Sequence, residues 1–351
     1  MKKTIIQGKK HLLLAGLKIP YETERSGSRC RLIIGPLRLP YWRSQSDDSL
    51  CIPLFGRELS LRRDRRARHY AMRRRLTDEK IRELLTEELS PLLGYRPDLE
   101  HPRSFNEKIN WMKLHAKDPL ITRCCDKYAV KCYAAERIGE EYVLPVLGVW
   151  SRADEIDFAC LPDRFVLKVN WSSGYNIIVR DKKALDLRET RRKLDRWMQP
   201  SQNSYYDMFN WGYKDMTPVI YAEPYIEQID GQLYDYKLFC CGGKFKFLFV
   251  STDRLNGRGL TYTFFDRALR PLPFRYGHKP NADPVPAMPA QLDRMIELAE
   301  KLAEPFPFVR ADFYETDGGR VYLGEMTFYS GGGTLGFDPV EWDYTLGEWM
   351  D

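Results

Sequence analysis

Beyond about residue 76, apolar residues recur at the spacing of helices that bury one face. In the first such stretch, Ile81, Leu85 and Leu89 follow each other at intervals of four. Thr77 is a favourable N-cap in front of two acidic residues, and Pro91 lacks the N–H that a continuing helix needs. The pattern therefore predicts a helix that begins after Thr77 and ends before Pro91.

Further helices are predicted by the same period. Ser104 and Glu107 have the spacing of a capping box and precede apolar residues that would lie on one helix face. We therefore expect a helix from Ser104 onward. Other helices are expected at residues 126–139, 187–198 and 292–302.

Short apolar runs bounded by turn residues predict strands between these helices. They cover residues 143–150, 164–169, 219–226, 235–240 and 244–250. Residues 309–314 and 320–323 are expected to form a hairpin that turns at the Asp-Gly-Gly sequence of 317–319. Helices mixed with strands that pair along the chain predict an α+β fold.

The first 75 residues have a different pattern, with Gly, Pro and Ser scattered through short apolar stretches and no sustained helical period. We expect residues 1–75 to be an N-terminal extension and residues 76–351 to be one catalytic domain. Arginines gather at the end of the extension, at Arg62, Arg63, Arg65, Arg66, Arg68, Arg73, Arg74 and Arg75. Two interpretations stay open: contact with an anionic membrane or a polyanionic glycan, or a solvated helix face.

Composition narrows the class of protein. A chain of 351 residues can bury a sizeable core, and 43% hydrophobic with 13% aromatic residues is typical of globular proteins. The net charge of +6 is modest for this length and selects no partner, and we expect none among nucleic acids. Eight cysteines without a C-x-x-C pair predict reduced thiols, and the apolar run at residues 11–17 is too short to span a bilayer. We expect a soluble cytoplasmic protein, with membrane contact only through the arginines.

The last predicted hairpin carries the strongest candidate chemistry. Arg310 and Asp312 alternate on one strand, and Glu325 and Thr327 alternate at the end of the other. Two acids across a hairpin, with a cation and a hydroxyl beside them, suit oxygen ligation of Mg²⁺ that bridges nucleotide phosphates. The alternative is a salt-bridged pair of polar strand faces.

A lysine in an apolar strand supplies a second candidate. Lys168 interrupts the apolar residues 165–169, and a small, turn-prone segment that includes Ser172, Ser173 and Gly174 follows it. Backbone N–H groups of such a loop can bind phosphate oxygens while the lysine adds a point charge. The alternative is a lysine on an edge strand.

Together with other segments, these residues resemble the ATP-grasp superfamily, and more closely its TupA-like branch, over about residues 76–347. The segments that carry the resemblance are residues 104–111, 126–130, 161–168, 235–237 and 324–329. The resemblance implies a nucleotide held between two α+β subdomains, with a hinge near residues 222–226.

The resemblance also implies roles for single residues. Those implied to bind ATP are Lys127 and Lys168 at the α- and β-phosphates, Ser172, Ser173 and Gly174 in a phosphate-covering loop that runs from Ser172 to Tyr175, Glu223, Tyr225 and Ile226 at the adenine, and Asp235 at the ribose. Further candidates for phosphate or carboxylate binding are Lys237, Arg254 and Lys279, and the alternative for each of them is a surface role. The implied catalytic groups are Arg310, Lys168, Asp312 and Glu325, with Asp312, Glu325 and Thr327 as ligands of two Mg²⁺ ions. Many ATP-grasp ligases have asparagine where Thr327 stands, so ligation there is expected to be weaker or mediated by water.

The activity implied is that of an ATP-dependent carboxylate–amine ligase that works through an acyl phosphate. The branch is named for teichuronopeptide synthesis and occurs in bacterial surface-polysaccharide gene clusters. We therefore expect an amino acid or amine to be joined to a uronic acid or a glycan-linked carboxylate of a capsule or lipopolysaccharide. An ATP-dependent phosphotransferase acting on a sugar or polysaccharide precursor, and a non-catalytic scaffold, stay open as alternatives.

Two competing nucleotide motifs are excluded. Residues 331–336 formally satisfy G-x-G-x-x-G, but they lead into Phe337 and Pro339 and not into a helix. In an ATP-grasp site this segment would line the acceptor pocket. The glycines before Lys244 lack the spacing of a P-loop and are followed by Phe245.

Overall fold

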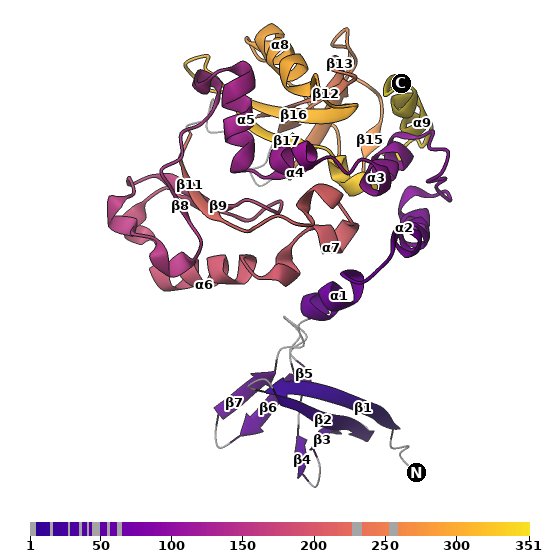
Figure 1. The fold of residues 1–351 in the computed structure, drawn as a ribbon, viewed down its shortest axis with the longest axis vertical. Helices are drawn as coiled ribbons and strands as arrows, with labels where there is room; N and C mark the ends of the chain where they lie inside the picture. Colours follow the sequence, from indigo (N-terminus) through magenta and orange to yellow (C-terminus); the bar gives the residue numbers. More distant parts are fainter. Residues whose placement is uncertain are drawn as a thin grey trace. The chain divides into compact units, whose positions relative to one another are not determined.

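The structure, a computed structural model, contains two compact units, Met1–Arg68 and His69–Asp351 (Figure 1). The residues that it describes are 5–14, 17–26, 29–34, 37–40, 42–43, 50–54, 57–61, 65–226, 234–252 and 259–351. The division between the units lies several residues before the boundary at residue 75 that the sequence pattern predicts. Each unit is described by itself below.

The first unit consists of antiparallel strands joined in chain order. One sheet contains β1 (Ile5–Leu14), β2 (Leu17–Ser26), β3 (Arg29–Ile34) and β4 (Leu37–Pro40). A smaller sheet contains β5 (Trp42–Arg43), β6 (Leu50–Leu54) and β7 (Arg57–Leu61). The absence of a helical period in the sequence agrees with these strands, although the strands themselves were not predicted.

The helices confirm most of the predicted pattern. They are α1 (Arg65–Arg73), α2 (Asp78–Leu93), α3 (Phe105–His115), α4 (Pro119–Cys125), α5 (Ala129–Ile138), α6 (Leu187–Trp197), α7 (Tyr205–Met208), α8 (Leu292–Ala303) and α9 (Glu341–Trp349). Both hydrogen bonds of the predicted capping box between Ser104 and Glu107 are present. The prediction that α2 ends before Pro91 was wrong, because Pro91 lies in the last turn and Gly94 forms the C-cap. Within the described residues, no helix combines the length and the apolar composition that crossing a membrane requires.

Two antiparallel sheets form the framework of the second unit, which confirms an α+β fold. The first has the order β10-β9-β11-β8, from β8 (Gly148–Trp150), β9 (Phe165–Val169), β10 (Asn176–Val179) and β11 (Ile220–Pro224). The second has the order β14-β13-β12-β16-β17, from β12 (Asp235–Cys241), β13 (Lys244–Thr252), β14 (Thr261–Phe265), β16 (Phe308–Glu315) and β17 (Val321–Thr327). A short ribbon pairs β15 (Arg275–Tyr276) with β18 (Phe337–Asp338).

One face of the second sheet is covered by α8 (Figure 1). Met295, Leu298 and Leu302 of α8 are fully buried, as are Leu238 of β12 and Ala311 of β16. Because side chains alternate along a strand, the neighbours of these strand residues point to the opposite face of the sheet. That opposite face carries the candidate site.

The predicted strand at residues 143–150 was too long. Only β8 forms there, and Val143 makes an isolated bridge to Leu323. Pro145 interrupts this apolar run and lacks the N–H that strand pairing needs, and Leu144 is the only buried residue of 143–150, so the composition of the run did not make it a strand.

Arg73 does not lie on a solvated helix face, which was one of the two interpretations of the arginine cluster. Its side chain is buried, forms an ion pair with Glu88 and donates to the carbonyl oxygen of Asp207 at 2.9 Å. Its guanidinium also lies 4.5 Å from the ring centroid of Phe209. Arg73 is therefore a packing residue of the second unit, whereas Arg74 and Arg75 are exposed.

Candidate active site

Three neighbouring strands place acids and cations on the sheet face opposite α8. Asp235 and Lys237 come from β12, Arg310 and Asp312 from β16, and Glu325 from β17. In the register of the sheet, Asp312 is the direct partner of Lys237 on one side and of Glu325 on the other. Alternation along each strand therefore brings charges that lie far apart in the sequence into one cluster.

Arg310 is the centre of a hydrogen-bond network. Its Nε donates to Asp312 Oδ1 at 2.6 Å, and its Nη2 donates to Asp312 Oδ2 at 2.7 Å and to Glu325 Oε1 at 3.2 Å. Thr327 Oγ1 accepts from Arg310 Nη2 at 3.0 Å and donates to Glu325 Oε1 at 3.0 Å. Lys237 forms an ion pair with Asp312. The network fixes both acids of the hairpin in one geometry.

The charges of this network shift the pKa values of its side chains. Burial opposes ionisation of both Arg310 and Glu325. The carboxylate of Asp312 outweighs burial at Arg310 and raises the pKa of the guanidinium above its usual value. Lys127, Lys237 and Arg310 outweigh it at Glu325 and hold the pKa of that carboxyl far below its usual value. Glu325 is therefore a carboxylate at neutral pH.

A second cluster lies on the other sheet, around Glu223 of β11. Lys168 of β9 pairs with one carboxylate oxygen and Lys131 of α5 pairs with the other. Although Glu223 is only 4% exposed, the two lysines outweigh burial and hold its pKa below the usual value. Lys131, which also donates to the carbonyl oxygen of Leu144 at 2.9 Å, was not among the predicted residues. Its spacing from Lys127, four positions earlier, was the one available signal.

Lys127 lies between the two clusters. Its Nζ donates to the carbonyl oxygen of Ser172 at 2.8 Å and lies 3.5 Å from Glu325 Oε2. Ser172 itself is buried and donates through Oγ to the carbonyl oxygen of Gln202 at 3.1 Å. Ser173 and Gly174 are exposed at the tip of this loop, where Gly174 has a φ of +76°. The base of the predicted phosphate-covering loop is thus anchored, while its tip faces outward.

A cavity of about 440 Å³ lies between these clusters, a volume in the range of small-molecule sites. Eight of the predicted residues line it: Lys127, Lys168, Ser173, Gly174, Asp235, Lys237, Asp312 and Glu325. Tyr175, the last residue of the predicted phosphate-covering loop, lines it too. The lining residues that were not singled out as binding groups are Asn176, Leu260, Tyr262, Tyr314 and Gly324. The structure therefore brings the cations and acids of the prediction to one place.

Other predicted residues are not part of this lining. Each of the four residues Ser172, Glu223, Arg310 and Thr327 contacts a lining residue without lining the cavity itself. At the predicted hinge, the ring of Tyr225 stacks on Arg164, with 4.5 Å between the guanidinium and the ring centroid. The lining does not include Tyr225, Ile226 or Lys279. The binding roles proposed for these three residues stay predictions. Arg254 lies outside the described residues.

Gly324 allows the close approach of an aromatic ring at the cavity wall. It falls at an irregularity in the pairing of β16 with β17, and a Cβ at this position would lie 2.5 Å from a ring carbon of Tyr314. Both residues line the cavity. No larger residue fits here without moving the ring.

The donor set at the hairpin fits Mg²⁺. Asp312 and Glu325 offer carboxylate oxygens on adjacent strands, and Thr327 adds a hydroxyl. Among the described residues, no three His, Cys, Asp or Glu side chains are grouped so that they could hold a metal by themselves. Mg²⁺ is commonly held by one or two carboxylates, with substrate phosphates and waters completing its shell. The hairpin therefore suits an ion that is shared with a nucleotide.

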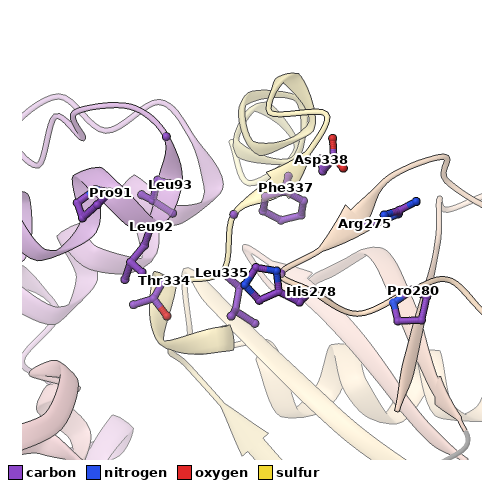
Figure 2. Close-up of a pocket in the computed structure, with 13 residues that line it drawn as sticks. Pro91, Leu92, Leu93, Arg275, His278, Pro280, Thr334, Leu335, Phe337 and Asp338 are labelled. Atoms are coloured by element: carbon purple, nitrogen blue, oxygen red, sulfur yellow. The ribbon is translucent and has the colours of Figure 1, made fainter. Parts of the chain in front are cut away.

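A second cavity, of about 610 Å³, lies beside the ends of α2 and β18 (Figure 2). Its wall includes Leu92, Arg275, His278, Thr334 and Leu335. It contains none of the predicted ATP or metal residues, so the charged cavity of 440 Å³ is the better candidate for the nucleotide.

Comparison with known proteins gives one family match. The family described as TupA-like ATPgrasp matches residues 107–351. No curated protein matches the chain.

Solved structures with some likeness include three synthetases and ligases. N5-carboxyaminoimidazole synthetase from Staphylococcus aureus is 14% identical, with 58% of this chain and 44% of that chain covered and a TM-score of 0.34. D-alanine–D-alanine ligase from Bacillus anthracis complexed with ATP is 14% identical, with 58% and 55% covered and a TM-score of 0.36. L-amino acid ligase from Bacillus licheniformis is 11% identical, with 73% and 53% covered and a TM-score of 0.38. The chain spans about half the length of these proteins.

Proposed function

The chain belongs to the TupA-like family of ATP-grasp enzymes, and on that premise we propose that it is an ATP-dependent ligase that joins a carboxylate to an amine. The observation that carries the proposal is the cavity of 440 Å³. There Lys127, Lys168 and Lys237 meet Asp312 and Glu325. Cations for phosphate oxygens and acids for a shared Mg²⁺ are the groups that ATP chemistry needs.

In the proposed reaction, a carboxylate oxygen of the substrate attacks the γ-phosphorus of ATP, and ADP leaves. The nitrogen of an amine then attacks the carbonyl carbon of the acyl phosphate, loses a proton and displaces inorganic phosphate. When bound, Mg²⁺ supplies neutralising charge at the phosphate oxygens. No covalent bond to the protein forms in either step.

The side chains contribute positioning and electrostatics. Lys127 and Lys168 hold phosphate oxygens, and the loop at Ser173 and Gly174 covers them and excludes water that would hydrolyse the acyl phosphate. Asp312 and Glu325, whose carboxylates the hairpin network fixes, would hold the Mg²⁺. Arg310 donates hydrogen bonds to both acids in this structure, and its action as a catalytic arginine stays part of the proposal.

The proposed substrates are a uronic acid or glycan-linked carboxylate and an amino acid or amine, in surface-polysaccharide biosynthesis. The family resemblance is the support for this choice. We place the reaction in the cytoplasm, because ATP is available there. Exposed Arg74 and Arg75 are proposed to add contact with an anionic membrane or glycan.

The test is release of ADP and phosphate from Mg²⁺-ATP across a panel of uronic acids, each with and without a panel of amines. We expect release to need both a carboxylate and an amine. Asp312→Asn should lower kcat about 100-fold or more, comparable to the loss of one preorganised charge contact. Glu315→Gln, on the same strand but outside the cavity lining, is the matched control and should leave turnover unchanged. Release of ADP with a hydroxyl acceptor and no amine would instead support a phosphotransferase.

A further inference from the structure

One face of α3 carries buried polar side chains. Asn106, Asn110 and Lys113 follow each other at intervals of four and three, so they lie on the same side of the helix. Their exposed fractions are 0%, 0% and 3%. Burial lowers the pKa of Lys113 to about 7, which reflects the cost of holding its charge there. Apolar residues would pack at these positions without the cost of burying polar groups. The three polar side chains are therefore expected to have a specific role.

All three donate to backbone carbonyl groups of one segment, residues 330–336, here called the glycine-rich loop. Asn106 Nδ2 also donates to Asp343 Oδ2 at 2.8 Å, and Asn110 Nδ2 to the carbonyl oxygen of Asn106 at 2.8 Å. Lys113 Nζ donates to the carbonyl oxygen of Gly332 at 2.6 Å and to Asn110 Oδ1 at 2.8 Å. Asn110 Nδ2 donates to the carbonyl oxygen of Gly333 at 2.7 Å. Asn106 Nδ2 donates to the carbonyl oxygen of Leu335 at 2.9 Å. The polar face of α3 therefore fixes the backbone of this loop over four residues.

The loop has a backbone that only glycine adopts readily. Gly331, Gly332 and Gly333 have φ values of +57°, +64° and +62°. A Cβ at Gly333 would clash with Asn110 Nδ2, and one at Gly331 would clash with the hydroxyl of Tyr276. The close contacts of the loop and its left-handed backbone thus both require glycine. A loop with three such glycines has high conformational entropy when free, so external hydrogen bonds are what hold it in one shape.

The loop connects the hairpin network to the second cavity. At its start, the buried Ser330 accepts a hydrogen bond through Oγ from Arg310 Nη1 at 3.0 Å. Toward its end, Thr334 and Leu335 form part of the wall of the cavity of 610 Å³ (Figure 2). Four residues of chain span at most about 14 Å, so that wall lies close to Arg310. A displacement of the loop therefore moves the partner of Arg310.

We propose that Asn106, Asn110 and Lys113 are positioning residues of this enzyme: they fix the glycine-rich loop, and through Ser330 they orient Arg310. The catalytic consequence rests on the proposed ligase function. The consequence for the loop does not, because it follows from the contacts alone.

The first test measures the loop directly, by amide hydrogen exchange in the full chain. Lys113→Met keeps an unbranched side chain that is one atom shorter, and it removes the ammonium group that donates to the loop. Lys108→Met is the matched control, since Lys108 lies on the same helix but donates to the carbonyl oxygen of Gly347 in α9, at 2.8 Å. We expect exchange in residues 330–336 to become about 10-fold faster or more in Lys113→Met and to stay unchanged in Lys108→Met. Equal protection in both variants would overturn the proposal.

The second test separates kcat from KM. Lys113→Met should lower kcat about 10- to 100-fold, the range expected for a small misplacement of a reacting group, with the KM for ATP within about twofold. Ser330→Ala should act through the same contact, so the double variant should lose no more than the worse single variant. Additive losses, or an equal fall of kcat in Lys108→Met, would contradict positioning through Ser330.

The proposal stays testable if Lys113→Met does not fold or if the unmodified chain is inactive. If Lys113→Met does not fold, Asn110→Asp replaces it. This variant keeps the acceptor for Lys113 but loses the donor to the carbonyl oxygen of Gly333, and the same exchange pattern is expected. If the unmodified chain forms no ADP with any carboxylate and amine, the ligase proposal fails, and hydrogen exchange still decides whether α3 fixes the loop.

Discussion

At the scale of single residues, the ion pairs of Glu223 join two elements behind the cavity. Its carboxylate holds Lys168 of β9 and Lys131 of α5, and only Lys168 reaches the cavity lining. If this carboxylate is removed, no acid neutralises the charges of the two lysines, and the two cations then repel each other in a largely buried region. Glu223 therefore sets both the stability of this region and the direction of Lys168.

Glu223→Gln should lower the free energy of unfolding by about 3 kcal/mol, the cost of leaving a buried charge without its partner. Glu300→Gln breaks an ion pair with the exposed Lys244 and should cost about 1 kcal/mol or less. Urea unfolding of both variants measures the difference, and calorimetry should show weaker ADP binding only for Glu223→Gln. Equal destabilisation by the two variants would mean that the Glu223 cluster is no more than a surface ion pair.

At the scale of elements, patterns that depend on neighbouring residues were predictable and contacts across the fold were not. The capping box of α3 and the β16–β17 hairpin follow from spacing and turn residues, and both form. Alternation also predicted that Arg310 and Asp312 share a face of their strand and that Glu325 and Thr327 share a face of theirs, but the pairing of Asp312 with Glu325 depends on the irregularity at Gly324. The helix α4 was missed, although Asp118 and Pro119 are a typical N-cap and first residue, because it is only seven residues long.

The features that the sequence did not predict are mostly contacts between residues far apart in the chain. Nothing in the local sequence indicates that Lys131 reaches Glu223, or that Lys113 reaches a glycine carbonyl 219 positions later. These pairs are set by how α5 and α3 pack on the sheets. The irregular pairing at Gly324 was also not predicted, since a lone glycine in a strand is compatible with several local structures.

Gly324→Ala tests the hairpin as an element of the cavity. Its Cβ would push the ring of Tyr314, so we expect the Kd for Mg²⁺-ADP to rise about 10-fold while the fold is retained. Gly318→Ala, in the turn of the same hairpin, meets no atom within 4 Å and should leave binding unchanged. Titration calorimetry of both variants is the measurement. A normal Kd for Gly324→Ala would show that the position of Tyr314 does not matter for the nucleotide.

At the scale of the whole molecule, the described candidate residues all lie in the unit His69–Asp351, and the family match falls within it. Arg73 belongs with this unit through Glu88 and Phe209. We therefore propose that the catalytic part of the chain needs α1, and that a boundary at residue 75 removes a packing residue.

Two shortened chains test this boundary. A chain that begins at residue 65 should bind Mg²⁺-ADP within about twofold of the full chain, because it keeps every contact of Arg73. A chain that begins at residue 76 should have a Tm several degrees lower, about what a loss of 1–2 kcal/mol gives in a domain of this size. Loss of nucleotide binding in the longer of the two would mean that residues 1–64 contribute to the site.

The central claim is that ATP activates a carboxylate as an acyl phosphate, and transfer of oxygen isotope tests it most directly. A uronic acid labelled with ¹⁸O in its carboxylate is incubated with the enzyme, Mg²⁺-ATP and an amine, and the released phosphate is analysed by mass spectrometry. We expect one ¹⁸O atom in each phosphate formed with amide, because the attacking carboxylate oxygen leaves with the phosphorus. Phosphate without the label, or a stable phosphorylated sugar in its place, would contradict it.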